Sequence, residues 1–450
     1  MKSVNVSNIV PDLQKSYGNY VNSFKMFPNI IDGLLPVQKR LLLTLHNSAR
    51  NEFVKTSSIL GRCMEMYHPH SEALGTAEWL VHNQFADAEG QWGIKFSSEP
   101  ASCAAPRYTK LKANKKIEDI SFELVNYVKW EESELQPEPI FIPTMIPFCL
   151  MGKYEYVAIG FGFKAEIPVY KEQDLVKRLL YLIGEIKEEV VISPSIDGIK
   201  FKRSKKIFKD LLESGNATLE VQGLFDVDEK NHKVHIYGWN PRVSFKSLIN
   251  KINSFKDYKL LESEDVSYYD LSMSNTDIVF EVSRTRNKKQ IYDKLVETIS
   301  EVMTSNISYH LYATDSRNQL VATSVDTMLL TCWKHYCETF DIYLEKKLED
   351  LNEKLNRIRI LSVIKKILLD NIKDYKLFTN YNYAKKLIIE KSKLSDDIVS
   401  SILSTKSIKN LIDADTDETE AKNNISNHEL LINNKKEYII KKYKSFGGIC

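Results

Sequence analysis

The sequence predicts an α+β protein with several domains, and three features of its 450 residues predict that class. The first third shows short helices separated by tight turns, the middle third alternates strands with helices, and the last third carries leucines at heptad spacing. At roughly 150 residues per domain, this length allows about three hydrophobic cores. The fold therefore does not depend on disulfide bonds for its stability.

The composition is that of an ordinary globular protein. Charged residues make up 27% of the chain and hydrophobic residues 43%, which argues against a disordered or a membrane protein. The 62 basic and 60 acidic residues nearly cancel, so any surface for nucleic acid must be local. No secretory signal follows the first lysine, and the six cysteines include no CxxC pair. We therefore expect a cytoplasmic protein without a zinc site or a disulfide framework.

Short helices are predicted from residue 28 to about 130. One begins at Pro36, because proline suits the first helical turn and an apolar run follows. A second is predicted from Thr56 to Met66 and ends at the YHPH turn, where Pro69 disfavours a helical residue before it. A third is predicted over 71–85, with a serine as its N-cap. Helix, tight turn and helix is the arrangement that places a recognition helix in a DNA groove.

From about residue 140 to 320 the pattern alternates strands with helices. Strands are predicted over 156–160, 217–221 and 233–237. This region contains a basic cluster, which consists of Lys200, Lys202, Arg203, Lys205, Lys206 and Lys209. The cluster is interpreted either as a solvated helix face or as a surface that binds DNA phosphates through counterion release.

The last third is predicted to be helical. Its seam of leucines and isoleucines consists of Leu344, Leu348, Leu351, Leu355 and Ile358, at spacings of 4, 3, 4 and 3. Such spacing is typical of a coiled coil. Ile425, Ile432 and Ile439 recur every seven residues. We therefore expect an outgoing helix, a helical knob near 365–420 and a returning helix, although the first seam alone would equally suit a dimer zipper.

Arg107 and Tyr108 place a guanidinium directly before a phenol, in a segment of small residues. A phenol can act as a nucleophile, but it is mostly protonated at neutral pH and needs a neighbouring base or cation. A guanidinium suits phosphate oxygens and the charge that develops on phosphorus. A structural tyrosine is the alternative interpretation.

Two histidines, His68 and His70, flank a proline. Such residues can contact phosphate, transfer a proton or bind a metal ion. No third metal ligand stands out near them, so we expect no metal site in this chain.

Five segments occur in an order that resembles a known family. They are IDGLLPVQKRLLLTL (31–45), YHPH (67–70), DAEGQWG (87–93), APRYTKL (105–111) and PEPIFIPTMIPFCLMGKYEYVAIGFGFKAEIPVY (137–170). Together they resemble the breakage-reunion subunit of type IIA DNA topoisomerases, the gyrase A and topoisomerase IV A subunits. Within that family, the chain is most similar to the medium subunit of the T-even-type bacteriophage enzymes.

The resemblance implies a division into four regions. These are an N-terminal arm (1–27), a winged-helix DNA-gate domain (28–145), an α/β tower domain (146–323), and an antiparallel coiled coil with a helical C-gate knob for dimerisation (324–450). The resemblance is diffuse after about residue 170. Because the sequence ends just after the returning helix, we expect no DNA-wrapping domain and no wrapping-driven supercoiling.

The resemblance also implies catalytic roles. Tyr108 would attack a DNA phosphorus and form a transient 5′-phosphotyrosyl link, and Arg107 would stabilise the transition state. His68 and His70 would contact phosphate or transfer a proton, and the resemblance does not choose between these roles.

DNA contacts are implied at further positions. Lys39 and Arg40 match the family's basic pair that holds the DNA backbone. Ile167 matches an isoleucine that wedges between base pairs and kinks the DNA; without the resemblance it would be interpreted as a buried strand residue. From the basic cluster we expect DNA contacts by Lys202, Arg203, Lys205 and Lys206.

The implied activity is that of the cleavage and religation subunit of an ATP-dependent type II topoisomerase, which relaxes and disentangles double-stranded DNA. The chain shows neither an ATPase motif nor the family's acidic metal cluster, so a large partner subunit would bind ATP and Mg²⁺. The active form would be a homodimer joined at the DNA gate and the C-gate. The alternative from another class is a dimeric helix-turn-helix protein that bends DNA without cutting it.

Overall fold

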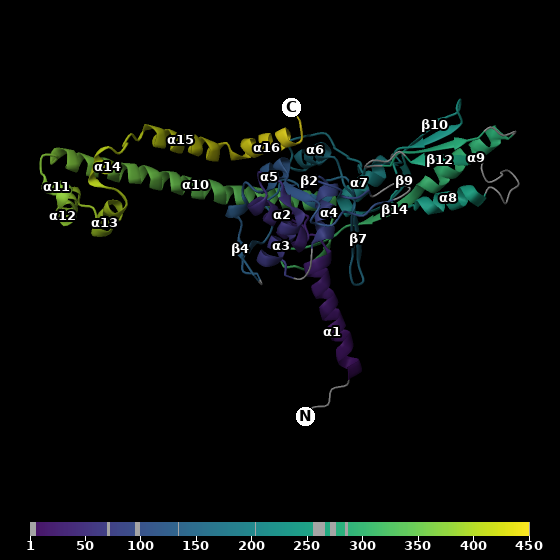
Figure 1. Cartoon of the computed structure of the whole chain (residues 1–450), viewed down its shortest axis with the longest axis horizontal. Coiled ribbons are helices and arrows are strands. Elements are labelled where there is room, and N and C mark those ends of the chain that lie inside the picture. The colour runs from purple at the N-terminus through teal and green to yellow at the C-terminus, as the bar shows by residue number, and fades with distance from the viewer. Residues whose placement is uncertain are drawn as a thin grey trace. The chain divides into compact units, whose positions relative to one another are not determined.

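The computed structural model describes residues 6–69, 73–94, 100–133, 135–202, 204–254, 266–270, 276–283 and 287–449. The chain divides into two compact units (Figure 1). The first comprises Met1–Thr339 with Lys442–Cys450, and the second comprises Phe340–Lys441. Two helices, α10 (Val325–Asp370) and α16 (Lys435–Phe446), contribute residues to both units.

The first unit begins with α1 (Val6–Val21), which continues into a π-helical turn, η1 (Asn22–Met26). Three short helices follow, α2 (Pro36–Ser48), α3 (Thr56–Met66) and α4 (Leu74–His82). The predicted start at Pro36 and both predicted ends of α3 are confirmed. The third helix ends at His82, three residues earlier than predicted. Helix α2 packs against both α3 and α4. The turn predicted between α3 and α4 includes residues 70–72, which lie outside the described residues.

A small antiparallel sheet accompanies these helices. It contains β1 (Val54–Lys55), β2 (Ala86–Glu89) and β3 (Lys110–Ala113) in the order β1-β3-β2. The register aligns Ala86 with Ala113 and Glu89 with Lys110. Strands of 2 to 4 residues carry too little alternation to be predicted from the residue pattern.

The segment that follows contains only short elements. They are α5 (Lys115–Ser121), η2 (Val125–Tyr127), β4 (Trp130–Glu131), β5 (Glu138–Pro139) and η3 (Phe148–Leu150). β4 and β5 form an antiparallel ribbon in which Glu131 lies opposite Glu138.

Two larger sheets make up the rest of the first unit. A five-stranded sheet has the order β6-β7-β14-β9-β8, and a four-stranded sheet has the order β10-β11-β13-β12. The strands of the first are β6 (Tyr156–Ile159), β7 (Lys164–Ile167), β8 (Ile199–Phe201), β9 (Asn216–Gly223) and β14 (Thr304–His310). Those of the second are β10 (Phe225–Asp228), β11 (Lys233–Ile236), β12 (Val266–Asp270) and β13 (Ile278–Val282). β6, β9 and β11 confirm the three predicted strands.

Helices alternate with the strands of these sheets along the chain. They are α6 (Glu172–Leu182), α7 (Lys205–Ser214), α8 (Phe245–Asn253) and α9 (Lys288–Met303). α8 and α9 share one apolar core with β11 and β13, in which Leu248, Phe280 and Leu295 are buried. A ribbon of β15 (Tyr312–Thr314) and β16 (Leu320–Ala322) leads into α10.

A buried ion pair joins α6 to the first turn of α10. The Arg178 side chain is only 1% exposed. It donates from Nε and Nη2 to the two carboxylate oxygens of Asp326, over 2.8 and 2.5 Å, and from Nη1 to the carbonyl of Val190 over 2.7 Å. This bidentate geometry satisfies a cation that would otherwise be costly to bury.

The second unit is entirely helical among the residues that the structure describes. Its core gathers Ile364 and Leu368 of α10 with Ala384, Ile388 and Val399. The short helices of this knob are α11 (Lys376–Thr379), α12 (Tyr381–Ser392), α13 (Asp396–Thr405) and α14 (Ile408–Ile412). They confirm the helical knob predicted near 365–420.

The returning arm consists of α15 (Thr419–Asn433) followed by α16, and α15 runs antiparallel to α10 (Figure 1). Arg359 pairs with Glu418 over 3.2 Å, and His428 Nε2 lies 2.8 Å from the carbonyl oxygen of Leu344. As the residue number falls along α10 it rises along α15, so the two helices form the predicted antiparallel pair within the chain. No helix in the described ranges is long and apolar enough to cross a membrane.

The expected seven-residue repeat of the returning arm is corrected by the structure. Ile439 is 1% exposed, but Ile432 is 36% exposed and its place against α10 is taken by the buried His428. α15 ends at Asn433 and α16 begins at Lys435, so Ile432 and Ile439 lie on different helices and do not form one continuous seam.

Candidate active site

Tyr108 lies in a turn that is anchored on the first turn of α3. The backbone N–H of Thr56 donates to the carbonyl of Thr109 over 3.0 Å, and that of Ser57 donates to the carbonyl of Pro106 over 3.2 Å. The first N–H groups of a helix have no acceptor within the helix itself, so the turn caps α3 with its own carbonyls. The N–H of Tyr108 closes the turn onto the carbonyl of Ala105 over 2.9 Å.

Two further contacts fix this turn. The hydroxyl of Thr109 donates to the hydroxyl of Thr56 over 2.8 Å, and both residues are fully buried. Gly90, just after β2, has φ +96°, and a Cβ there would lie 2.8 Å from the carbonyl oxygen of Tyr108. A glycine therefore allows the loop after β2 to pack directly against the backbone that carries Tyr108.

The side chain at the end of this rigid turn is open to solvent. Tyr108 is 66% exposed, and the guanidinium carbon of Arg107 lies 4.8 Å from the centre of its ring. This distance is typical of a cation–π contact. The exposure disfavours a structural tyrosine. The arrangement offers a phenol, with a cation beside it, to a ligand too large to enter a pocket.

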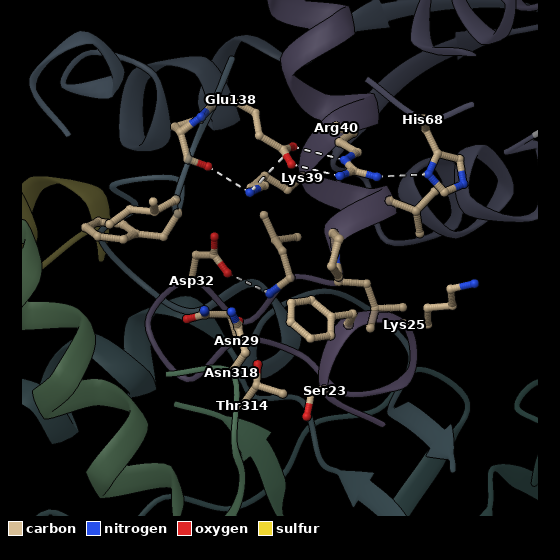
Figure 2. Close-up of a pocket in the computed structure, with 18 of the residues that line it drawn as sticks. Ser23, Lys25, Asn29, Asp32, Lys39, Arg40, His68, Glu138, Thr314 and Asn318 are labelled. Atoms are coloured by element: carbon tan, nitrogen blue, oxygen red, sulfur yellow. Dashed lines mark hydrogen bonds and ion pairs between the residues drawn. The ribbon is translucent and has the colours of Figure 1, made fainter. Parts of the chain in front are cut away.

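A cavity of about 870 Å³ contains three further predicted site residues, Lys39, Arg40 and His68 (Figure 2). Lys39 and Arg40 reach it from α2, His68 from the residues after α3, and Glu138 from β5. Arg107 and Tyr108 are not among the described residues that line this cavity, so they do not share it with His68, the other predicted catalytic residue that the structure describes.

Glu138 is the central acceptor of the cavity (Figure 2). Arg40 donates to it twice, from Nε over 3.0 Å and from Nη2 over 2.8 Å. Lys39 Nζ lies 3.6 Å from the same carboxylate and donates to the carbonyl of Pro139 over 2.7 Å. The side chains of Lys39, Arg40 and Glu138 are only 12%, 18% and 12% exposed. Sequence analysis identifies the basic pair but misses Glu138, whose only signal is the PEP triplet that opens the last of the five segments.

A buried carboxyl group supports the loop beneath these cations. Asp32, 1% exposed, accepts the backbone N–H groups of Leu34 and Ile142, each over 2.9 Å. Burial raises the pKa of Asp32 to about 6, although both hydrogen bonds and the charge of Lys39 oppose the rise. Its role here is to join the loop before α2 to the segment after β5.

The structure corrects the expectation that Ile167 is exposed for insertion into DNA. Ile167 is fully buried in β7, opposite Tyr156. A side chain that separates base pairs must first be exposed, so Ile167 does not act as a wedge in this conformation. The exposed apolar residues of the β6–β7 hairpin are Val157, Ile159, Phe161 and Phe163, and Ile159 is the most exposed at 69%.

The described members of the basic cluster lie on β8, at Lys202 just after it and on α7, and they are partly paired. Lys202 lies 3.0 Å from Glu220, and Lys205 lies 3.7 Å from Glu189. Lys206 is exposed. Two predicted site residues, His70 and Arg203, lie outside the described residues. Within the described ranges, no group of three or more His, Cys, Asp or Glu side chains is arranged to hold a metal ion.

Comparison with known proteins gives one family and several relatives. The family of DNA gyrase/topoisomerase IV A subunits matches residues 26–445. The DNA gyrase A subunit of Neisseria gonorrhoeae is 24% identical over 314 residues, which are 63% of this chain and 33% of that protein. That of Buchnera aphidicola is 24% identical over 424 residues, 87% of this chain and 49% of that protein. The DNA topoisomerase 4 A subunit of Bacillus subtilis is 22% identical over 326 residues, 67% of this chain and 40% of that protein. The chain thus spans at most about half the length of these curated relatives.

Proposed function

Because the chain belongs to the family of DNA gyrase/topoisomerase IV A subunits, we propose that it is the DNA-cleaving and religating subunit of a type II topoisomerase. The observation that carries this proposal is the 66% exposure of Tyr108 on a turn anchored to α3. A nucleophile that attacks duplex DNA must project from the surface, because a duplex cannot enter a closed pocket. Its backbone must also be held, because catalysis depends on orientation.

The reaction exchanges one phosphodiester for another. The Tyr108 oxygen forms a bond to a DNA phosphorus and loses its proton, while the bond from phosphorus to the 3′ oxygen breaks and that oxygen gains a proton. The exchange conserves the phosphodiester, so religation is the same step in reverse. Arg107, beside the ring, stabilises the charge that develops on the phosphate oxygens.

The DNA is held by cationic and hydrogen-bonding side chains in two places. Lys39, Arg40 and His68 contact the backbone near the cleaved phosphate, together with His70, and the basic cluster on β8 and α7 contacts the duplex farther away. Ile167 contacts base pairs only after the β6–β7 hairpin rearranges. The exposed Ile159 and Phe161 offer an apolar wedge without such a rearrangement.

The proposal includes partners. Two copies of this chain act on opposite strands and join through a DNA-gate domain (28–145) and a C-gate domain (324–450), with a tower domain (146–323) between them and an N-terminal arm (1–27). Because the sequence shows neither an ATPase motif nor the family's acidic metal cluster, a large partner subunit would hold Mg²⁺ and hydrolyse ATP, and no step here runs through either. We assign the chain to the T-even-type phage branch of the family, acting in the cytoplasm.

A cleavage assay tests this function. The chain is incubated with the partner subunit, Mg²⁺ and supercoiled plasmid, and the reaction is quenched with detergent and protease. We expect linear DNA with peptide on its 5′ ends. Tyr108→Phe should abolish this product, whereas Tyr381→Phe, at an exposed tyrosine of the knob, should not. Bent but uncut DNA with the wild-type chain would instead support the non-cleaving DNA-bending protein.

A further inference from the structure

The geometry around His68 determines which ring nitrogen carries the proton. Arg40 Nη1 lies 3.3 Å from His68 Nδ1 (Figure 2). A guanidinium has only hydrogen-bond donors, and it stays protonated in proteins. Nδ1 must therefore accept this hydrogen bond with its lone pair. A neutral imidazole whose Nδ1 accepts carries its proton on Nε2.

Glu138 fixes the direction in which Arg40 donates. Its carboxylate binds Nε and Nη2 of the guanidinium at 3.0 and 2.8 Å, a bidentate contact that sets the plane of the fork. Nη1 then points to the ring of His68. Glu138 is itself held, because β5 pairs with β4 and Lys39 donates to the carbonyl of Pro139. β5 therefore fixes the position of Glu138, Glu138 fixes the guanidinium of Arg40, and Arg40 fixes the imidazole of His68.

We propose that Glu138 is a positioning residue that acts through Arg40 to hold His68 as the neutral Nε2–H tautomer, a hydrogen-bond donor to a DNA phosphate oxygen. The proposal rests on the proposed function and deepens it, because it chooses between phosphate contact and proton transfer. In this tautomer Nδ1 accepts from Arg40 and Nε2 carries the proton, so neither nitrogen can take up another proton without breaking this arrangement. His68 therefore does not accept the proton that Tyr108 loses.

The tautomer is measured directly on the full-length chain without DNA. Nuclear magnetic resonance of the chain with isotope-labelled histidine separates the two neutral tautomers and the imidazolium by their ring shifts, and His68→Gln identifies the signal. We expect the Nε2–H form in the wild type and a mixture of forms in Glu138→Gln and Arg40→Lys. Glu131→Gln is the matched control, because Glu131 lies opposite Glu138 in the ribbon and pairs with Lys129; it should leave the signal unchanged.

Cleavage by two His68 variants provides a second readout. A glutamine amide N–H can replace the Nε2–H donor but cannot act as a base, and an alanine can do neither. His68→Ala should slow cleavage by about 100-fold, as removal of a donor to a developing anion does, and His68→Gln should recover about 10-fold of that loss. Equal loss in both variants, or an Nδ1–H or imidazolium signal in the wild type, would overturn the proposal. Absence of cleavage by the wild type would overturn the proposed function alone, since the tautomer is measured without DNA.

Discussion

Replacing Gly90 by alanine should displace the backbone of Tyr108 without touching its side chain. The new Cβ would lie 2.8 Å from the carbonyl oxygen of Tyr108 and 3.2 Å from Cα of Thr109, and both are backbone atoms that cannot turn aside. Alanine also has to adopt a φ of +96°, which costs about 1–2 kcal/mol for a residue with a side chain. If the turn moves away, the hydrogen bond from Thr56 to Thr109 is lost, at a further cost of about 1 kcal/mol.

We therefore expect the free energy of unfolding to fall by about 2–3 kcal/mol. A misplacement of about 1 Å lowers the rate of an oriented reaction by about 100-fold, so formation of the covalent complex should slow by a similar factor. The rate is measured by trapping protein-linked DNA over time, at a temperature where urea unfolding shows the variant to be folded.

Gly61→Ala is the matched control for this experiment. Gly61 lies within α3, and a Cβ there meets nothing within 4 Å. Alanine in a helix interior is favoured over glycine by up to about 1 kcal/mol, so the control should cleave normally and be slightly more stable. A wild-type rate of covalent complex formation in Gly90→Ala would refute the view that the anchored turn places the nucleophile.

Three further predictions concern the rest of the first unit. Arg178→Met should lower the free energy of unfolding by about 3 kcal/mol, because it leaves the carboxylate of Asp326 largely buried without its cation; urea unfolding measures this, and a loss below about 1 kcal/mol would contradict it. Ile159→Ala should reduce DNA bending, measured by energy transfer between labels at the DNA ends, without lowering the free energy of unfolding. Ile167→Ala should lower the free energy of unfolding by about 2–5 kcal/mol. Loss of bending in Ile167→Ala with no loss of stability, and normal bending in Ile159→Ala, would show that the wedge is misassigned. Asp32 binds its proton more tightly in the folded state, so the free energy of unfolding should fall by up to about 3 kcal/mol as pH rises from about 4 to about 6. Asp32→Asn should remove this fall. The same dependence of the unfolding free energy on pH in the variant and the wild type would contradict the prediction.

Much of the helical architecture could be predicted from local patterns. The start of α2 at Pro36 and the whole of α3 follow from residue types that suit helix ends. The outgoing seam follows from leucine spacing, since Leu344 and Leu355 are buried as expected. Burial of His428 rather than Ile432 could not be predicted, because apolar spacing does not identify a histidine whose Nε2 lies 2.8 Å from the carbonyl oxygen of Leu344 in another helix.

In the candidate site, too, some residues could be predicted from the sequence and others could not. Arg107 and Tyr108 could be selected from residue chemistry together with the resemblance, because their role depends on side chains that stand next to each other in sequence. The role of Glu138 could not, because it lies 98 residues from Arg40 and the two meet only through tertiary packing. Ile167 shows the limit of a matched motif, which identifies a position but not whether its side chain is exposed.

Since the carbonyls beside Tyr108 are the acceptors for the first amides of α3, fraying of that helix end and release of the nucleophile are a single event. Amide hydrogen exchange at Thr56 and Ser57 therefore reports how long the phenol stays in place, in the resting chain and with no DNA present. Protection of these two amides should rise when DNA binding tightens the turn and fall in any variant that loosens it.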